Sequence, residues 1–78
     1  MKFINKGSYE FFAVDSEEYR IYEWPDYKIR IDNPLFVSVN NKNGGHRVFD
    51  SDGISHYIPS GWKHLFWKAK KNRPHFVK

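Results

Sequence analysis

The chain has 78 residues, enough for one small domain over residues 1–78, and no cysteine, which excludes disulfides, thiolate nucleophiles and thiolate metal ligands. Aromatic residues make up 19% of the sequence, so some rings are expected at the surface. Residues 1–59 carry seven Lys or Arg against nine Asp or Glu, whereas residues 60–78 carry six basic residues and no acidic one. This asymmetry favours nucleic acid or an acidic protein surface as the partner, although net charge also serves solubility.

The first residues contain neither an apolar core nor a small-residue cleavage site, so they do not resemble a signal peptide. No run approaches the roughly 20 apolar residues that a membrane span needs. Small secreted domains usually carry disulfides, which this chain cannot form. We therefore expect a cytoplasmic protein without membrane contact, in the cytoplasm of a host if a phage encodes it.

Period-2 alternation, the signature of strands, dominates the chain. The first run, residues 9–14, is followed by a polar turn at 15–17 and by a second run at 18–23. In that second run Tyr19 and Ile21 share one face, and Arg20 and Tyr22 share the other. The acidic residues around this turn are expected to form a solvated patch: Asp15, Glu17 and Glu18.

The middle of the chain predicts a meander of short strands. Leu35, Val37 and Val39 should face the core, and Ile29 and Ile31 share a face with Tyr27. Turn residues separate the runs, including the Gly-rich stretch 41–45 and an Asp-Gly turn at 52–53. The predicted strands are 27–32, 35–40, 46–50 and 54–58.

The segment 62–70 has two readings. As a helix it would begin after an N-cap at Ser60, with Trp62, Leu65 and Phe66 on one face. As a strand, Leu65 and Trp67 would point one way, and His64, Phe66, Lys68 and Lys70 the other. The aromatic content favours the strand, followed by a turn at 71–74 and a return strand at 75–77.

The pattern as a whole predicts an all-β fold, or a β-rich α+β fold if the C-terminal segment is helical. Six or seven short strands leave no room for crossover helices, so the sheet should be antiparallel. A small sheet must curl to bury one face. The expected architecture is a curled meander or a partly open barrel of the SH3-like or OB-like kind, ending in a hairpin or a short helix.

Cations and rings alternate near the C-terminus, the pattern of a surface that binds single-stranded nucleic acid. Lysines would neutralise phosphates, while rings would stack on bases. A solvated lysine face beside a core of rings explains the same pattern equally simply. The candidate binding residues, for nucleic acid or for a protein partner, are Lys63, His64, Phe66, Trp67, Lys68, Lys70, Lys71 and Arg73.

The histidines give only thin support for metal binding or catalysis. A three-residue loop after Asp50 would place Val48 opposite His56, so that His46, His56 and Asp50 share a face, whereas a loop one residue shorter would flip one strand and remove this coincidence. No metal-ligand spacing supports a site there, and no metal, cofactor or catalytic residue is predicted. A small ribonuclease, the third hypothesis for the function, would need an acid–base pair from the four histidines, with Asp50 or Asp52 and Arg47 as further groups. The four are His46, His56, His64 and His75.

The first hypothesis is thus a small basic, non-enzymatic protein, monomeric or homodimeric, that contacts single-stranded DNA or RNA. The second is a protein that binds and occludes a host or defence protein. The compact, cysteine-free chain, rich in Lys, Asn and aromatic residues, resembles small phage-encoded or mobile-element proteins of that inhibitory kind. This resemblance rests on composition and transfers no residue roles.

Overall fold

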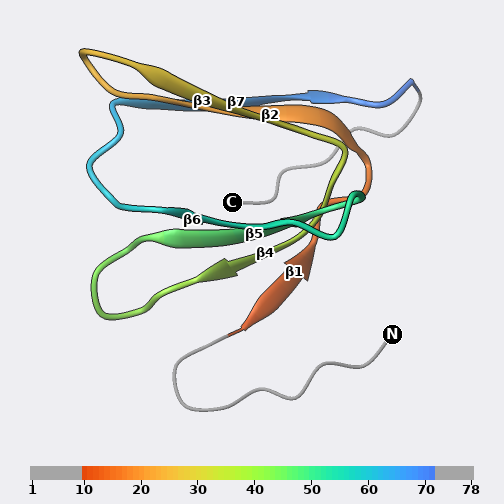
Figure 1. The fold of residues 1–78 in the computed structure, drawn as a ribbon, viewed down its shortest axis with the longest axis horizontal. Coiled ribbons are helices and arrows are strands. Elements are labelled where there is room, and N and C mark those ends of the chain that lie inside the picture. The colour runs from red at the N-terminus through yellow and green to blue at the C-terminus, as the bar shows by residue number, and fades with distance from the viewer. Residues whose placement is uncertain (1–9, 72–78) are drawn as a thin grey trace.

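The computed structural model describes residues 10–71, which form seven strands and no helix. The strands are β1 (Phe11–Ala13), β2 (Glu17–Glu23), β3 (Lys28–Asp32), β4 (Pro34–Val39), β5 (His46–Asp50), β6 (Ser55–Ile58) and β7 (His64–Ala69). Sheet A has the order β1-β4-β5-β6, and sheet B has the order β3-β2-β7. The two antiparallel sheets lie as separate layers, face to face, and do not close into a barrel (Figure 1). The prediction of a small antiparallel β fold is confirmed.

The C-terminal segment is a strand, as the aromatic content favoured, and the helical alternative is wrong. β7 pairs with β2, with Leu65 opposite Tyr22 and Trp67 opposite Arg20. Leu65 therefore shares the inner face of sheet B, while Phe66 points outward. The predicted return strand at 75–77 lies outside the described residues. Nothing within residues 10–71 forms a helix that could span a bilayer.

The meander is confirmed for β4, β5 and β6, but not for β3. Gly44 (φ 79°) and Gly53 (φ 82°) supply the left-handed backbone that the two hairpin loops need. Val48 lies opposite His56, the register expected for a three-residue loop. β3, by contrast, pairs with β2 in sheet B. The chain changes layers at Asn33, whose φ of 49° makes a sharp corner before β4.

The core lies between the two layers. Its fully buried side chains come from both sheets: Val14, Tyr22, Ile31, Val37, Val48 and Ile58. Of the three residues of β4 that were expected to face the core, Val37 is fully buried, while Leu35 and Val39 are half-buried. Trp24 and Trp62 pack against this core at one end, between the layers, which explains how a small domain accommodates large rings.

A chain of buried polar groups runs from sheet B into sheet A. Glu17 accepts two hydrogen bonds from Arg20, at 2.9 Å to Nε and 2.6 Å to Nη2. Arg20 Nη1 donates to the hydroxyl of Tyr22 at 3.2 Å. The Tyr22 hydroxyl lies 2.6 Å from Nδ1 of His46, on sheet A. Because the Tyr22 oxygen accepts from Arg20, its own proton is available for Nδ1, which suits the His46 tautomer protonated at Nε2.

The expectation that Glu17 belongs to a solvated acidic patch is wrong, because its side chain is fully buried. A register shift lies between Glu17 and Tyr19 in the pairing of β2 with β7. Under strict alternation, Glu17 and Arg20 would lie on opposite faces of the strand. The bulge brings both side chains to the inner face, where the carboxylate balances the guanidinium.

Burial and charge pairing have opposite effects on the pKa values of these buried polar groups. Burial lowers the pKa of Arg20, but the hydrogen bond to Glu17 and the neighbouring Tyr22 outweigh it, so the pKa lies above its ordinary value. Burial raises the pKa of the Tyr22 hydroxyl, and the charge of Arg20 offsets part of that rise. Arg20 is therefore charged and Tyr22 neutral at physiological pH.

Candidate functional site

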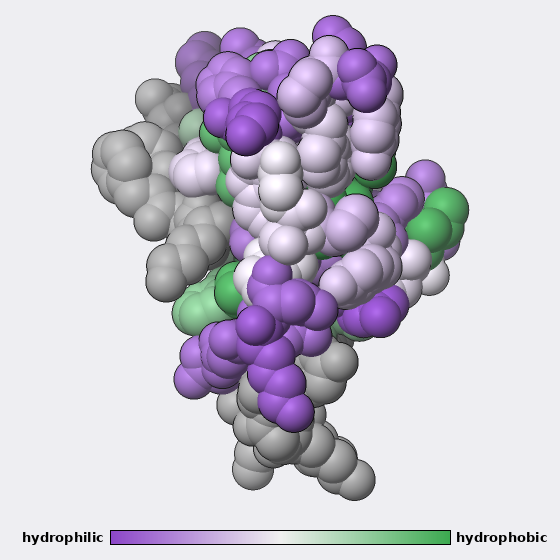
Figure 2. Space-filling model, turned by 90° about the vertical axis from the view of Figure 1, so that its left-hand side faces the viewer, coloured by the Kyte–Doolittle hydropathy of each residue, from purple (hydrophilic) through white to green (hydrophobic). Residues whose placement is uncertain are grey.

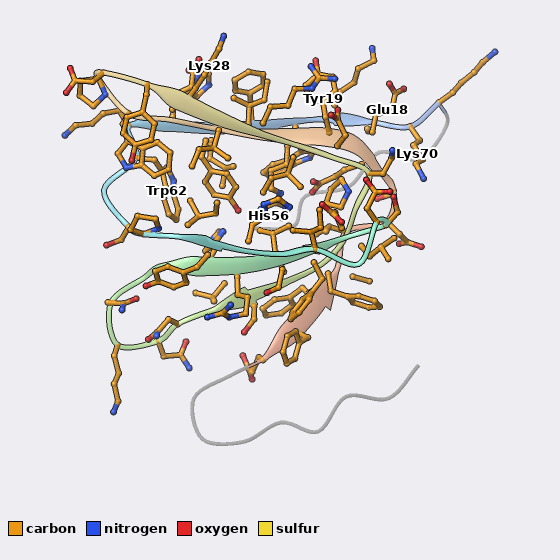
Figure 3. The ribbon with its side chains drawn as sticks, in the orientation of Figure 1. Glu18, Tyr19, Lys28, His56, Trp62 and Lys70 are labelled. Carbon is orange, nitrogen blue, oxygen red and sulfur yellow. The ribbon has the colours of Figure 1, made fainter. Side chains whose placement is uncertain are left out.

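The outward-pointing side chains of sheet B form one continuous surface, which we call the outer face of sheet B. The registers of β2 with β3 and β7 place these side chains in rows across the three strands. Figure 3 shows Lys28 and Tyr19 projecting from this sheet, away from sheet A. The surface comprises Tyr19, Ile21, Glu23, Lys28, Arg30, Asp32, His64, Phe66 and Lys68.

Rings and an arginine make up the middle of the outer face. The His64 and Phe66 rings are stacked, with centroids 4.9 Å apart and an interplanar angle of 26°. The guanidinium of Arg30 lies 4.1 Å from the centroid of the Tyr19 ring. Ile21 sits between them, opposite both Phe66 and Arg30, and is only 8% exposed. This row is therefore a packed platform of planar groups.

Lysines are concentrated on sheet B and at its ends. Of the six lysines within residues 10–71, only Lys42 belongs to sheet A, where it lies in the β4–β5 loop. Among the described residues, no carboxylate lies within 4 Å of any lysine ammonium group. The five lysines of sheet B and its ends are Lys28, Lys63, Lys68, Lys70 and Lys71.

Carboxylates on the outer face are mostly engaged by groups other than lysine. Asp32 accepts a hydrogen bond from Arg30 at 2.8 Å, and Glu23 lies 2.7 Å from Nδ1 of His64. Glu18, next to the bulge, is exposed. The outer face thus mixes both signs of charge, but none of its carboxylates forms an ion pair with its lysines in the described part of the chain.

The structure places three of the eight predicted binding residues on one surface, and three more next to the ends of β7. His64, Phe66 and Lys68 lie on the outer face, as expected. Lys63 precedes β7 and donates its backbone N–H to the backbone carbonyl of Glu23, while Lys70 and Lys71 follow β7. Arg73 lies outside the described residues.

Trp67 does not belong to this surface, although the sequence analysis included it. It lies opposite Arg20 on the inner side of sheet B, and its ring centroid is 4.9 Å from the buried guanidinium. Period-2 alternation already separated Trp67 from Phe66 and Lys68. The Trp67 ring packs over the Arg20 guanidinium, and this contact accounts for the half-buried state of Trp67.

Six of the nine residues of the outer face were missed by the sequence analysis, among them Tyr19, Lys28 and Arg30. Alternation correctly put Lys28 and Arg30 on the polar face of their strand. It could not show that β2 lies between β3 and β7, which places these side chains beside those of the C-terminal strand. A pairing between β2 and β7, whose paired residues are 41 to 52 positions apart, has no local signal in one sequence.

An open pocket of about 450 Å³ adjoins the outer face at the β2–β3 turn. Figure 2 views this end of the molecule, where strongly hydrophilic atoms lie over the turn and paler, less hydrophilic atoms lie beneath it. The pocket is lined by Glu23, Trp24, Pro25, Asp26, Tyr27, Lys28, Lys63 and His64. Glu23, Lys28 and His64 belong to both the pocket and the outer face.

The predicted shared face of His46, His56 and Asp50 exists, but these groups do not form a metal site. His46 is bonded to Tyr22, whereas Nε2 of His56 lies 2.7 Å from Asp50 Oδ2, between the layers (Figure 3). No group of three or more His, Asp or Glu side chains suited to a metal ion occurs within residues 10–71. His64 lies on the opposite side of sheet B, apart from both of these histidines.

Asp50 organises the β5–β6 hairpin, and its ionisation should control the acid stability of the fold. Its carboxylate faces His56 and accepts hydrogen bonds from the backbone N–H groups of Ile54 and Asp52. These bonds, that with His56 foremost, hold the pKa of Asp50 below its ordinary value.

A carboxyl group with a lowered folded-state pKa stabilises the fold above its unfolded pKa of about 3.9. That contribution is lost as the pH falls through the lower, folded-state pKa. We therefore expect Asp50→Asn to be less stable than the parent at pH 7, and the difference to shrink below about pH 4. Urea unfolding at pH 7, 5 and 3 measures this, with Asp52→Asn as the control. A difference that does not change with pH would contradict the role of Asp50.

Comparison of the chain with protein-family models, with curated proteins and with solved structures finds no match. The case for a function therefore rests on the chemistry and geometry of the described residues.

Proposed function

We propose that the protein is a non-enzymatic binding protein that holds single-stranded DNA or RNA against the outer face of sheet B. One observation carries the proposal. Five lysines with no carboxylate partner in the described part of the chain lie on sheet B and at its ends, and two of them, Lys28 and Lys68, flank a row of planar side chains on its outer face.

Single-stranded nucleic acid needs both kinds of group. Ammonium groups neutralise phosphates and release counterions, whereas rings stack on bases irrespective of sequence. On the outer face, Phe66 offers a ring already supported by His64, and Arg30 with Tyr19 offers a second planar pair. Lys28 and Lys68 lie on the two outer strands, so a chain that crosses the sheet meets a cation on each side of the rings.

Replacing Lys68, Lys70 and Lys71 together with Ala should weaken binding of a deoxythymidine oligonucleotide at least about tenfold at moderate salt. The plot of log K against log [salt] should become less steep by about 2, because each cation releases roughly 0.7 counterion from a single strand. Fluorescence anisotropy over a salt series measures both quantities. The thermal midpoint should change little, since these side chains make no ion pair in the described structure.

Lys42→Ala is the matched control, because Lys42 is exposed and lies on the β4–β5 loop of sheet A. It should leave both the affinity and the salt slope nearly unchanged. If Lys42→Ala reduced the slope as much per lysine as the triple replacement, binding would depend on total charge alone, and the outer face would not be the site.

A protein partner is the second candidate function, as for an inhibitor that occludes a host or defence protein. The observation in its favour is the exposed Tyr27 ring, 53% accessible, with both signs of charge around it in Lys28, Lys63 and Asp26. Exposed aromatic anchors of this kind often dominate protein interfaces. A stoichiometric complex that survives nuclease treatment on size exclusion would favour this candidate.

A further inference from the structure

The pocket at the β2–β3 turn contains a stacking surface that is formed before any ligand arrives. The Trp24 and Tyr27 rings are nearly parallel, with centroids 4.8 Å apart and an interplanar angle of 9°. The backbone N–H of Trp24 donates to the carbonyl of Tyr27 at 2.8 Å, which closes the turn. Behind Trp24 lie Tyr22 and Trp62, both at 6.4 Å between centroids. Trp24 is thus fixed from behind, and Tyr27 presents its ring to solvent.

The same pocket carries cations and acceptors. Lys28 and Lys63 both line it, and neither has a carboxylate within 4 Å in the described part of the chain. Of its two carboxylates, Glu23 is engaged by His64. Asp26 has no hydrogen-bond or ion-pair partner within residues 10–71. The pocket therefore offers a ring to stack on, ammonium groups for an anion and a carboxylate that can only accept hydrogen bonds.

A nucleotide matches these three elements together. A carboxylate near an anionic ligand is repulsive unless the ligand also presents N–H donors to it. Guanine presents two adjacent donors on its Watson–Crick edge, from the ring N–H and the exocyclic amino group, and a carboxylate can accept both in parallel. Cytosine and adenine present a single amino group on that edge, and thymine and uracil a single ring N–H.

We propose that this pocket selects a guanine base from the bound strand, with Tyr27 as the stacking surface, Asp26 as the acceptor and Lys28 and Lys63 at the phosphate. The assignment rests on the proposed function, because the outer face of sheet B supplies most of the affinity. Lys28 and His64 line the pocket and also lie on the outer face, so a strand along the sheet leads directly into the pocket.

The test compares deoxythymidine oligonucleotides about eight residues long that differ by a single guanine, placed at the 5′ end, the 3′ end or the centre. We expect at least one position to bind about fivefold or more tightly than the all-thymidine strand, whereas adenine or cytosine there gives little gain. Asp26→Asn should reduce this ratio to about one, while the affinity for the all-thymidine strand should not fall, because the substitution removes a negative charge.

Asp52→Asn is the matched control, because Asp52 is an exposed carboxylate on the β5–β6 hairpin of sheet A. This variant should retain the guanine preference. Tyr27→Ala should lose it, and thermal unfolding checks that this variant folds. The parent protein could bind the all-thymidine strand yet bind the guanine-containing strands no more tightly at any position. That result would overturn the guanine pocket and leave the proposed function in place. Absence of any oligonucleotide binding at low salt would overturn the proposed function, and the pocket assignment with it.

Discussion

Replacement of Glu17 by Gln is expected to lower the free energy of unfolding by about 3–5 kcal/mol. The Glu17 and Arg20 side chains are both fully buried, and two hydrogen bonds join them. Gln keeps the shape of the side chain but removes the charge that balances the guanidinium, which must then stay charged in a medium of low polarity. Urea or guanidinium unfolding, followed by tryptophan fluorescence, measures the loss.

Two controls separate the charge effect from a general sensitivity of β2. Glu18→Gln alters the adjacent, exposed carboxylate and should change the stability by no more than about 0.5 kcal/mol. The double variant Glu17→Leu with Arg20→Met replaces the whole pair by apolar groups and should be more stable than Glu17→Gln alone. Equal effects of Glu17→Gln and Glu18→Gln would show that the buried pair is not the cause.

The second large effect is expected at Ile31, at the centre of the contact between the layers. Ile31 is 1% exposed and belongs to the core cluster, with neighbours from both sheets. Ile31→Ala should cost about 2–5 kcal/mol, because it removes buried methyl groups and leaves a cavity that the two rigid sheets cannot fill. The midpoint of chemical unfolding should shift without a large change in its slope.

Ile54 provides the matched control for this substitution, since it is 52% exposed on the β5–β6 hairpin. Ile54→Ala should change the stability by no more than about 0.5 kcal/mol. Ile31→Val, which removes one methylene group, should fall between the two at about 0.5–1.5 kcal/mol. A loss at Ile54 as large as that at Ile31 would mean that the core does not lie between the layers as described.

Local features of the fold were predictable from the sequence, because short-range chemistry determines them. Alternation identified β3 and its polar face. Glycine-containing turns identified the β4–β5 and β5–β6 hairpins, whose loops contain Gly44 and Gly53. Of the two loop lengths left open after Asp50, the three-residue loop gives the observed pairing of Val48 with His56. In each of these cases the interacting residues are close in the chain, so few alternatives compete.

The features that were missed depend on contacts between distant segments. The inward side chain of Glu17 results from a bulge in the pairing with β7, and a strand pattern read alone does not contain it. The position of Trp67 against Arg20 and the approach of Lys28 to the C-terminal strand depend likewise on β2 lying in the middle of sheet B. For the candidate site, the sequence identified the cations at and around β7. Only the pairing of β2 with both β3 and β7 shows that the cations of β3 lie on the same surface.

The pairing of β2 with β7 also affects how the protein is made. β2 is synthesised early, but its second neighbour, β7, is the last strand of the described chain. In the same way, β1 has no strand to pair with until β4 has been synthesised. While the nascent chain is still on the ribosome, one edge of β2 has no neighbour and can pair with other chains. The outer face of sheet B exists only after β7 has left the ribosome, so an incomplete chain that ends before His64 cannot present it.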